Sequence, residues 1–186
     1  MLSSISPTTG RLLISEPFMP DPIFKRSVIL LTEYSEAGAM GFILNHLSEY
    51  LLGDVLPEVS YSEIPIYVGG PVSTNTLHFI HCCPEKIEDG IEIGEGIFWG
   101  GDFEKVKELI SSYQLTEHEI RFFTGYSGWT PKQLDNEIKA DSWIVTDKNA
   151  GVIFTDGEEN FWRKMVISMG HRYAHIANFP ENPELN

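Results

Sequence analysis

The chain is poor in the features that mark secreted and membrane-spanning proteins. It has only two cysteines, Cys82 and Cys83, and because they are adjacent they cannot build the disulfide framework of a small secreted domain. It has no apolar run long enough to cross a bilayer, and no basic start followed by the apolar stretch of about 7–15 residues that a signal peptide needs. We therefore expect a cytoplasmic protein without a membrane segment, with both thiols reduced.

Positive charge is also scarce. The 186 residues include 13 Lys and Arg against 27 Asp and Glu, which gives a formal net charge of −14. The only dense basic groups are two pairs, Lys25-Arg26 and Arg163-Lys164. Because affinity for nucleic acids comes largely from neutralising phosphates, this balance argues against direct binding of DNA. We expect a protein or small-molecule partner, whose identity the sequence does not reveal.

The material for one folded domain is present. With 186 residues, 42% of them hydrophobic, the chain can bury roughly 70% of its unfolded surface without disulfides or metals. We expect a single domain over residues 1–176. A flexible C-terminal tail is expected over 177–186, because this segment contains two prolines and few residues that pack.

Short apolar runs predict strands, and apolar residues at helical spacing are concentrated later in the chain. Because strands come first in a run and helices are interspersed late, the pattern favours an α+β fold over a regular alternation of strands and helices. The predicted strands cover residues 11–15, 27–32, 38–45, 66–68, 77–83, 97–99, 120–126 and 142–146. The predicted helices cover 51–56, 103–113, 130–139 and 161–169.

Turn and capping residues place several boundaries of these elements. The turn at 35–38 should join the strands on either side of it into a hairpin. Asp102 should cap the helix that follows it, and Gly170 should end the last helix. A second hairpin is expected between the strand at 142–146 and a further strand at 152–155.

The segment 121–134 is the most distinctive stretch of the sequence. It joins an aromatic strand to a helix through Gly125 and Gly128, which allow backbone angles that other residues resist. Thr130 stands in the N-cap position of the expected helix, and Gln133 stands where a capping-box partner reaches back. The segment therefore predicts a tight corner at a helix N-terminus, where an anion can bind or the rings can pack. This corner presents Tyr126, Ser127 and Trp129.

A second glycine-rich turn, Gly-Gly-Pro-Val at 69–72, follows a short predicted strand. Its glycines would let a ligand approach the main chain, although a tight turn alone also explains them. Asn45 would lie near this turn if the neighbouring strands pair.

Several motifs occur together in one order along the chain. They are Pro17-Phe18-Met19, Asp21-Pro22-Ile23-Phe24, Ser27-Val28-Ile29-Leu30-Leu31, Gly38-Ala39-Met40-Gly41-Phe42-Ile43-Leu44-Asn45, Gly69-Gly70-Pro71-Val72, Gly125-Tyr126-Ser127-Gly128-Trp129, Gln133-Leu134, Glu137-Ile138 and Ser142-Trp143. In this order and spacing, the chain resembles the AlgH/YqgE-like family of bacterial proteins over roughly residues 10–170.

The resemblance implies an α+β fold whose bifurcated, mostly antiparallel sheet curls into a pseudo-barrel flanked by helices. Members of the family are often described as transcriptional regulators, after one member linked to alginate production. The resemblance implies no reaction, cofactor or catalytic residue.

We interpret the chain as a regulatory or binding module that acts through a protein or small-molecule partner. Glycines and aromatic residues concentrate at the two chain reversals, which would rim a pocket or groove. No acid–base or nucleophile set can be assembled from the sequence, so no catalytic residue is predicted. The candidate binding residues are Asn45, Gly69, Gly70, Pro71, Tyr126, Ser127, Gly128 and Trp129.

Two other functional classes stay open. One is a hydrolase-like enzyme with a site near Ser127, Asn45 or Glu137. The Gly-x-Ser-x-Gly pattern of a nucleophile elbow fails, however, because Trp129 stands in the place of the second glycine. The other class is a DNA-binding transcriptional regulator, which the charge balance disfavours.

Histidines and cysteines near residue 80 resemble metal ligands at first sight. On a strand, alternation places His78 and Cys82 on one face and His81 and Cys83 on the other, so each pair would need two more ligands for zinc. We predict no metal. We predict no cofactor either, because the chain has neither a dinucleotide-binding glycine fingerprint nor a Walker A lysine.

Overall fold

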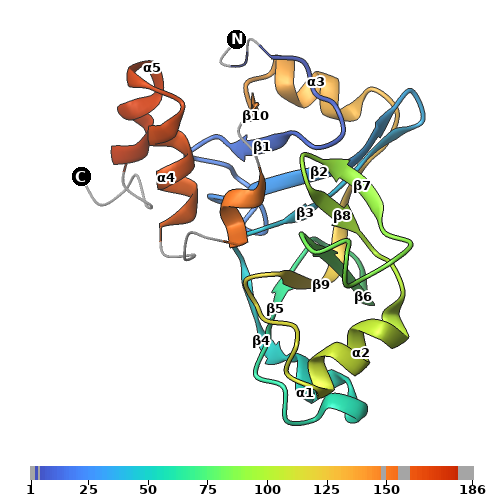
Figure 1. The fold of residues 1–186 in the computed structure, drawn as a ribbon. Helices are drawn as coiled ribbons and strands as arrows, with labels where there is room; N and C mark the ends of the chain where they lie inside the picture. The colour runs from blue at the N-terminus through green and yellow to red at the C-terminus, as the bar shows by residue number, and fades with distance from the viewer. Residues whose placement is uncertain (1–2, 4, 148–149, 155–159, 180–186) are drawn as a thin grey trace.

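The computed structural model describes residues 3, 5–147, 150–154 and 160–179 (Figure 1). The strands are β1 (Leu12–Ser15), β2 (Val28–Ser35), β3 (Gly38–Ile43), β4 (Leu47–Leu51), β5 (Pro65–Val68), β6 (Val72–His81), β7 (Ile91–Gly94), β8 (Ile97–Trp99), β9 (Ile120–Trp129) and β10 (Trp143–Thr146). The helices are α1 (Leu52–Val55), α2 (Phe103–Ser111), α3 (Gln133–Lys139), α4 (Phe161–Ser168) and α5 (His171–Ala174). Short 3-10 turns are η1 (Pro57–Val59), η2 (Ala150–Phe154) and η3 (Ile176–Asn178).

The described strands form one branched sheet. Its main path runs β10-β1-β2-β3-β9-β6-β8-β7, and β5 joins β9 while β4 joins β5. The pairing of β5 with β9 is parallel, and the other pairings are antiparallel. Since β10 and β7 lie at opposite ends of this path, the sheet curls without closing. The α+β class and the bifurcated, mostly antiparallel sheet are therefore confirmed.

Strand β9 belongs to both branches of the sheet. Its first half pairs with β5 and β6, for example Phe122 with Ile66, and its last residues pair with β3, for example Trp129 with Ala39. On one edge of β9, the partner changes from β5, paired up to Thr124, to β3, paired from Ser127, while β6 on the other edge stays paired as far as Tyr126. Gly125 lies within this change of partner, and its φ of +63° suits glycine. The strand can thus serve an upper and a lower lobe, as Figure 1 shows.

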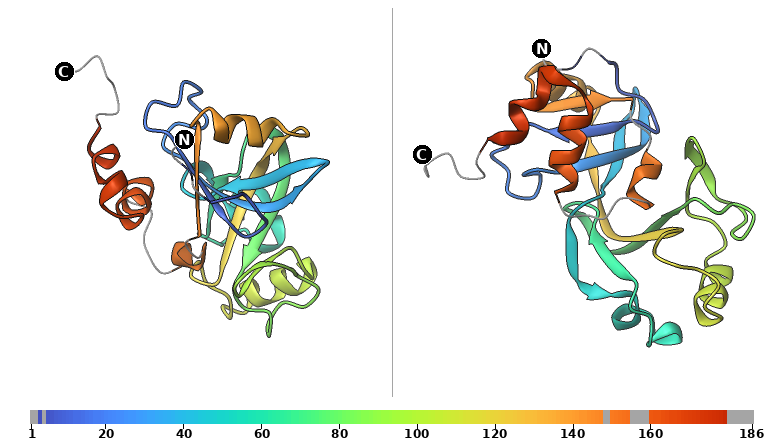
Figure 2. Two further views of the ribbon diagram at one scale, coloured as in Figure 1. Left: turned by 90° about the horizontal axis from the view of Figure 1, so that it is seen from above. Right: turned by 60° about the vertical axis from the view of Figure 1, so that its left-hand side comes forward.

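Helices cover the sheet on several sides (Figure 2). In the upper lobe, Leu134 and Ile138 of α3 pack with Ile29 and Ile43 of the sheet. Phe161 and Trp162 of α4, together with other residues, bury the opposite face in the largest apolar cluster. In the lower lobe, Val106, Leu109 and Ile110 of α2 pack on Phe79 and Phe122. Both lobes are therefore built on the same continuous, branched sheet.

Several predicted boundaries are confirmed. The hairpin of β2 and β3 turns between Ser35 and Gly38, which are paired residues. The Asp102 side chain accepts a hydrogen bond from the Lys105 backbone N–H at the start of α2. Helix α4 ends at Ser168, just before Gly170 with φ +98°.

The predicted hairpin of 142–146 with 152–155 is wrong. Strand β10 pairs instead with β1, in the register Leu12 to Thr146 and Ser15 to Trp143. Residues 150–154 form the 3-10 turn η2, and Phe154 is buried in the largest apolar cluster. The pairing of β10 follows from burial, because all four residues of β1 are buried and three of them are apolar. Thr155 lies outside the described residues.

The corner at 121–134 is more extended than the sequence predicts. Strand β9 continues to Trp129, and α3 begins at Gln133 rather than at Thr130. A left-handed Lys132, with φ +64°, separates the two elements. The capping contact is nevertheless present, since the Gln133 side-chain oxygen accepts from the Thr130 backbone N–H at 3.0 Å.

The sequence did not predict two strands, β4 and β7, and β6 begins earlier than expected. Exposed residues dominate β4 and β7, so their apolar signal is weak. At the other end of the chain, Ala177 is buried, and the Phe179 ring lies 5.2 Å from that of Phe18. Residues 180–186 lie outside the described part, and the domain limits stay a prediction. No described helix is long and apolar enough to cross a bilayer.

Candidate functional site

The structure brings the glycine turn and the aromatic corner into direct backbone contact. The Gly69 N–H donates to the Thr124 carbonyl at 2.9 Å, and the Gly69 carbonyl accepts from the Ser127 hydroxyl at 3.0 Å. A Cβ added to Gly70 would lie 2.3 Å from the carbonyl carbon and oxygen of Tyr126. Glycine is therefore required here by a close approach of two backbones, where the sequence analysis considered a ligand or a turn.

Trp129 points into the interior beneath α3. Its side chain is 7% exposed, and its indole N–H donates to Glu137 at 2.9 Å. The same carboxylate oxygen accepts from the Trp143 indole at 2.8 Å, and the two indole rings meet edge-on at 6.0 Å. The other Glu137 oxygen accepts from the Gln133 amide at 2.9 Å. Glu137 thus fastens α3 to the sheet.

Ser127 and Tyr126 face different surroundings. Ser127 is fully buried, and its hydroxyl donates to a carbonyl oxygen. Tyr126 is half-buried on another side of β9, where its ring meets the His78 ring edge-on at 6.1 Å. The His78 ring also lies 5.2 Å from that of Phe42 and 6.4 Å from that of Trp99. Pro71 and Gly128 are exposed.

Asn45 lies in the segment that follows β3. Backbone hydrogen bonds from Ile43 N–H to the Gly69 carbonyl and from Val68 N–H to the His46 carbonyl place this segment next to the glycine turn. Its side-chain oxygen accepts from the Val28 N–H at 2.8 Å, and its amide donates to the Arg26 carbonyl at 2.9 Å. These bonds clip the loop before β2 to the end of β3. The Asn45 side chain also lines a pocket that the other candidate residues do not reach.

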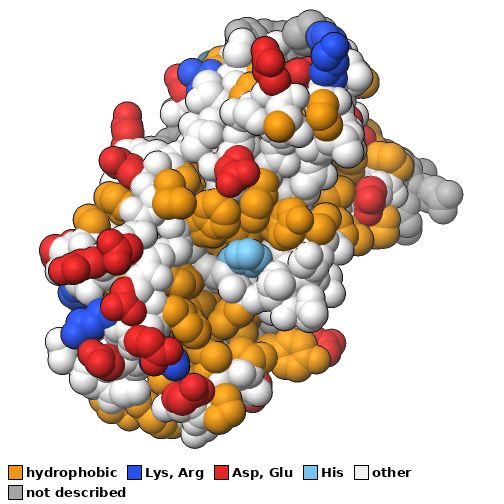
Figure 3. Space-filling model, turned by 90° about the vertical axis from the view of Figure 1, so that its right-hand side faces the viewer, with side chains coloured by type: hydrophobic (Ala, Val, Ile, Leu, Met, Phe, Trp, Pro, Cys, Tyr) orange, Lys and Arg blue, Asp and Glu red, His pale blue; other side chains and the backbone are white. Residues whose placement is uncertain are grey.

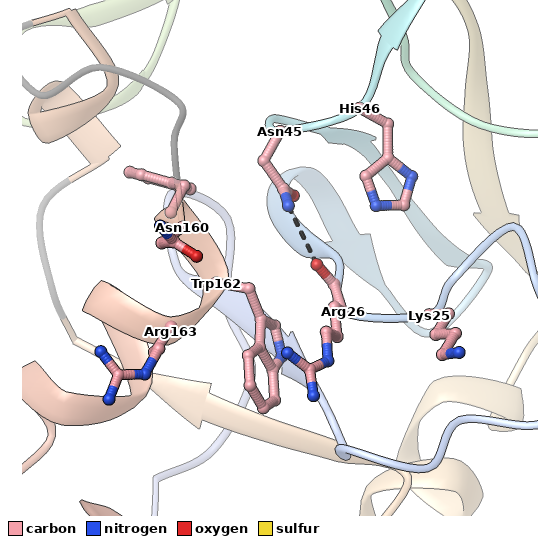
Figure 4. Close-up of a pocket in the computed structure, with 8 residues that line it drawn as sticks. Lys25, Arg26, Asn45, His46, Asn160, Trp162 and Arg163 are labelled. Atoms are coloured by element: carbon pink, nitrogen blue, oxygen red, sulfur yellow. Dashed lines mark hydrogen bonds between the residues drawn. The ribbon is translucent and has the colours of Figure 1, made fainter. Parts of the chain in front are cut away.

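This pocket, which we call the basic pocket, has a volume of about 350 Å³. It lies between the loop before β2, the connection from β3 to β4, and the start of α4 (Figure 4). Of the described residues that line it, three are lysine or arginine and none carries a carboxylate. Its lining residues are Lys25, Arg26, Asn45, His46, Asn160, Phe161, Trp162 and Arg163.

Both arginines of the basic pocket are held in place. The Arg26 guanidinium lies 5.0 Å from the centre of the Trp162 ring and donates to the Phe179 carbonyl at 2.6 Å. The Trp162 indole in turn donates to the Ser15 carbonyl at 3.0 Å. Arg163 donates to the Ala177 carbonyl at 3.2 Å and to the Asn178 side chain at 3.0 Å. The two guanidinium groups are therefore held in fixed positions.

His46 adds a neutral polar group to the wall of the pocket. Burial lowers the pKa of its imidazole from 6.5, while hydrogen bonds with the backbone of Lys25, Arg26 and Ile23 oppose part of that shift. The ring is consequently mostly neutral near pH 7 and leaves the positive charge of the pocket to the lysine and the arginines.

Sequence reasoning identified Asn45 but missed the rest of the basic pocket. Lys25-Arg26 and Arg163-Lys164 were noted as the only basic pairs, and the fold brings three of these four residues to one cavity. The sequence did contain a signal for this pocket, because adjacent basic residues are unusual in a chain with so many acidic ones. Nothing in the sequence showed that the two pairs meet.

The histidines and cysteines near residue 80 are arranged as strand alternation predicts. His81 Nδ1 lies 3.9 Å from Cys83 Sγ, and His81 Nε2 lies 3.1 Å from the Gly100 carbonyl oxygen. Burial, with help from nearby Glu119, raises the pKa of Cys83 to about 12, so its thiol stays protonated. Within the described residues, no group of three or more His, Cys, Asp or Glu side chains could hold a metal ion.

The geometry defines an α+β protein whose open sheet divides along one shared strand, with helices packed on both lobes. The AlgH-like family model matches residues 12–174, and the chain belongs to that family. It is 42% identical over 177 residues to a UPF0301 protein of Chlorobium limicola, with 95% of each chain covered. It is 40% identical over 180 residues to a UPF0301 protein of Cytophaga hutchinsonii, covering 96% of this chain and 99% of that one.

Two solved structures share the fold. The crystal structure of protein DIP2367 from Corynebacterium diphtheriae superposes with a TM-score of 0.77 at 23% identity, covering 94% of each chain. The solution structure of the AlgH protein from Pseudomonas aeruginosa gives a TM-score of 0.72 at 26% identity, covering 96% of this chain and 98% of that one. The branched sheet is thus shared by this chain and both of these structures.

Proposed function

We propose that this protein is a cytoplasmic binding module that captures a small anionic ligand in the basic pocket. It would regulate through that ligand or through a protein partner, without direct contact with DNA. The observation that carries the proposal is that three of the four residues of the two basic pairs, Lys25, Arg26 and Arg163, line one cavity in a chain of net charge −14. In such a chain, three cations among the described lining residues, with no carboxylate among those residues, support a site for negative charge.

The chemistry of the lining favours a carboxylate or phosphate group. Arginine presents donors in a fork that matches either group, and Lys25 supplies a further ammonium charge. The volume of about 350 Å³ lies at the small end of ligand pockets, which hold about 300–1,000 Å³. The buried Trp162 ring, already beneath Arg26, gives the cavity a firm apolar wall. A small metabolite with one or two anionic groups fits these properties.

The proposal is tested by titrating the full chain with inorganic phosphate and with citrate while recording amide NMR spectra. We expect saturable shifts at residues of the basic pocket. The variant Lys25→Gln should weaken binding about tenfold or more, because a hydrogen bond to a charged group contributes about 1.5–3 kcal/mol. Arg163→Gln should act in the same direction, although it also loses the bonds to Ala177 and Asn178.

The matched control is Lys164→Gln. Lys164 is the exposed neighbour of Arg163 on α4 and does not line the pocket, so its loss removes the same charge without touching the site. Equal weakening by Lys25→Gln and Lys164→Gln would show a diffuse charge effect and contradict the proposal. Shifts confined to other surfaces, or none that saturate with either anion, would contradict it as well.

A further inference from the structure

Tyr113 occupies a position at the end of α2 where glycine is usual. The helix ends with Ser112 as its cap, after which the Tyr113 N–H donates to the Ile110 carbonyl and the Gln114 N–H donates to the Leu109 carbonyl. These two bonds form the Schellman motif. In this motif the residue directly after the C-cap is left-handed and is most often glycine. Tyr113 adopts that conformation with φ +57°. A large side chain therefore occupies a position whose backbone conformation disfavours a Cβ.

The Tyr113 side chain gains little from burial, since it is 81% exposed. Its ring lies 5.7 Å from the ring of Tyr61, which is itself 49% exposed. Two large aromatic rings thus stand together in solvent at the tip of the lower lobe. A strained and exposed aromatic residue points to a role in binding rather than in folding.

The two rings border a cavity of about 360 Å³, which we call the tyrosine cleft. Apolar residues from both sides form its floor, among them Ile64 and the buried Leu115. Glu63 and Glu117 also line it, and none of the lining residues in the described part of the chain is a lysine or arginine. The cleft therefore combines aromatic faces, an apolar floor and carboxylates.

Cations near the cleft are engaged with other groups. Lys107 bridges Glu58 at 3.3 Å and Glu104 at 2.8 Å, and Lys86 donates to the Gln114 carbonyl at 2.9 Å while it pairs with Glu119. Figure 3 shows acidic side chains crowding the lower lobe of the face that carries α2, with few lysines or arginines among them. The electrostatic surroundings of the cleft thus favour a positively charged occupant.

We propose that the tyrosine cleft docks an extended segment of a protein partner in which Lys or Arg side chains flank an apolar residue. The cations would lie against the tyrosine faces and the carboxylates of Glu63 and Glu117, and the apolar residue would cover the floor. This cleft shares no residue with the basic pocket, so the inference stands independently of the anionic ligand.

The test is an NMR titration of the full chain with a synthetic pentapeptide in which two arginines flank a leucine. A matched peptide carries glutamates in place of the arginines. The basic peptide should shift the signals of Tyr61, Tyr113 and Leu115 with saturation, and more weakly at high salt. The acidic peptide should leave them unchanged. Equal responses to both peptides, or no response to either at millimolar concentration, would refute the proposal.

Variants separate docking from folding. Tyr113→Gly should lower the affinity for the basic peptide at least fivefold and leave the melting temperature unchanged or higher, because glycine suits φ +57°. Glu63→Gln combined with Glu117→Gln should lower the affinity comparably. The controls are Tyr50→Ala, which removes an exposed tyrosine on β4, and Glu36→Gln, which removes an exposed charge on the β2–β3 hairpin. A cleft variant that binds as tightly as these controls would overturn the assignment.

Discussion

The indole N–H of Trp129 donates to a carboxylate oxygen of Glu137 at 2.9 Å. Trp129 ends β9 and Glu137 is the fifth residue of α3, so the bond closes the short connection between the two elements. The same oxygen receives the indole of Trp143 from the start of β10. One carboxylate therefore ties a helix to two strands of the upper lobe, and the rings fill the space between them.

Glu137→Ala should destabilise the protein by about 2–4 kcal/mol, because an unpaired buried donor costs about 1–3 kcal/mol and two indoles lose their acceptor. Urea unfolding measures the change. Asn136→Ala, at an exposed position of the same helix, is the control and should change the free energy of unfolding by less than about 0.5 kcal/mol. A Glu137→Ala protein as stable as this control would show that water replaces the carboxylate.

Gly70→Ala should be among the most damaging alanine substitutions in the chain. The new Cβ would lie 2.3 Å from the Tyr126 carbonyl, and backbone of a paired strand cannot move aside. We expect a loss of at least about 3 kcal/mol, at the upper end of overpacking effects. Gly96→Ala is the comparison, since Gly96 has φ +74° and no atom within 4 Å of its Cβ position. That variant should lose only about 1–2 kcal/mol from backbone strain. Similar losses, measured by thermal unfolding, would contradict this reasoning.

Stability should rise with pH between about 5.5 and 7.5. Burial lowers the pKa values of His46, His78 and His81 below 6.5, so the unfolded chain binds protons more readily than the folded one in this range. The contribution of these neutral histidines to the free energy of unfolding is complete above the pKa of the unfolded chain. It is lost as the pH falls toward the lower pKa of the folded protein. His78→Phe keeps an aromatic ring beside Phe42 and Tyr126 but cannot titrate. Its free energy of unfolding should therefore depend less steeply on pH, and an unchanged slope would rule out His78 as a contributor.

Duplex DNA should not bind the protein directly, because the net charge is −14 and the basic pocket is a small cavity rather than a long basic face. Fluorescence anisotropy with a labelled duplex at low salt checks this expectation. A salt-sensitive rise in anisotropy that Lys25→Gln abolishes would instead support a DNA-binding regulator. A rise that survives this substitution would place the DNA contact on another surface.

Local elements with strong patterns could be read directly from the chain. The hairpin around Ser35–Gly38 and the Asp102 cap depend on contacts between residues close in sequence, and both are present. The family motifs likewise supported the branched α+β fold. The hairpin assigned to residues after Thr146 failed because β1, far away in sequence, offered β10 a better partner. The strand propensity of a segment does not show which of two possible partner strands will pair with it in the folded protein.

Site residues show the same division. The glycines at 69–70 and 125 were recognised as special, but only the paired strands show that they permit close backbone contact. Trp129 was expected at a recessed surface, and it is buried against Glu137. Whether the turn and the corner also bind a ligand stays a prediction. The left-handed Tyr113 left no trace in the sequence, because backbone angles of single residues depend on the helix end they follow.

The amino-acid sequence by itself determined the composition of charge, the local turns and caps, and the family to which the chain belongs. These properties depend on neighbours within a few residues, or on the whole set of motifs in order. Only the tertiary structure decided that Lys25-Arg26 meets Arg163, and that Tyr61 meets Tyr113. Such meetings arise from burial of apolar faces across the whole sheet, which is a non-local balance of free energies that no short segment encodes.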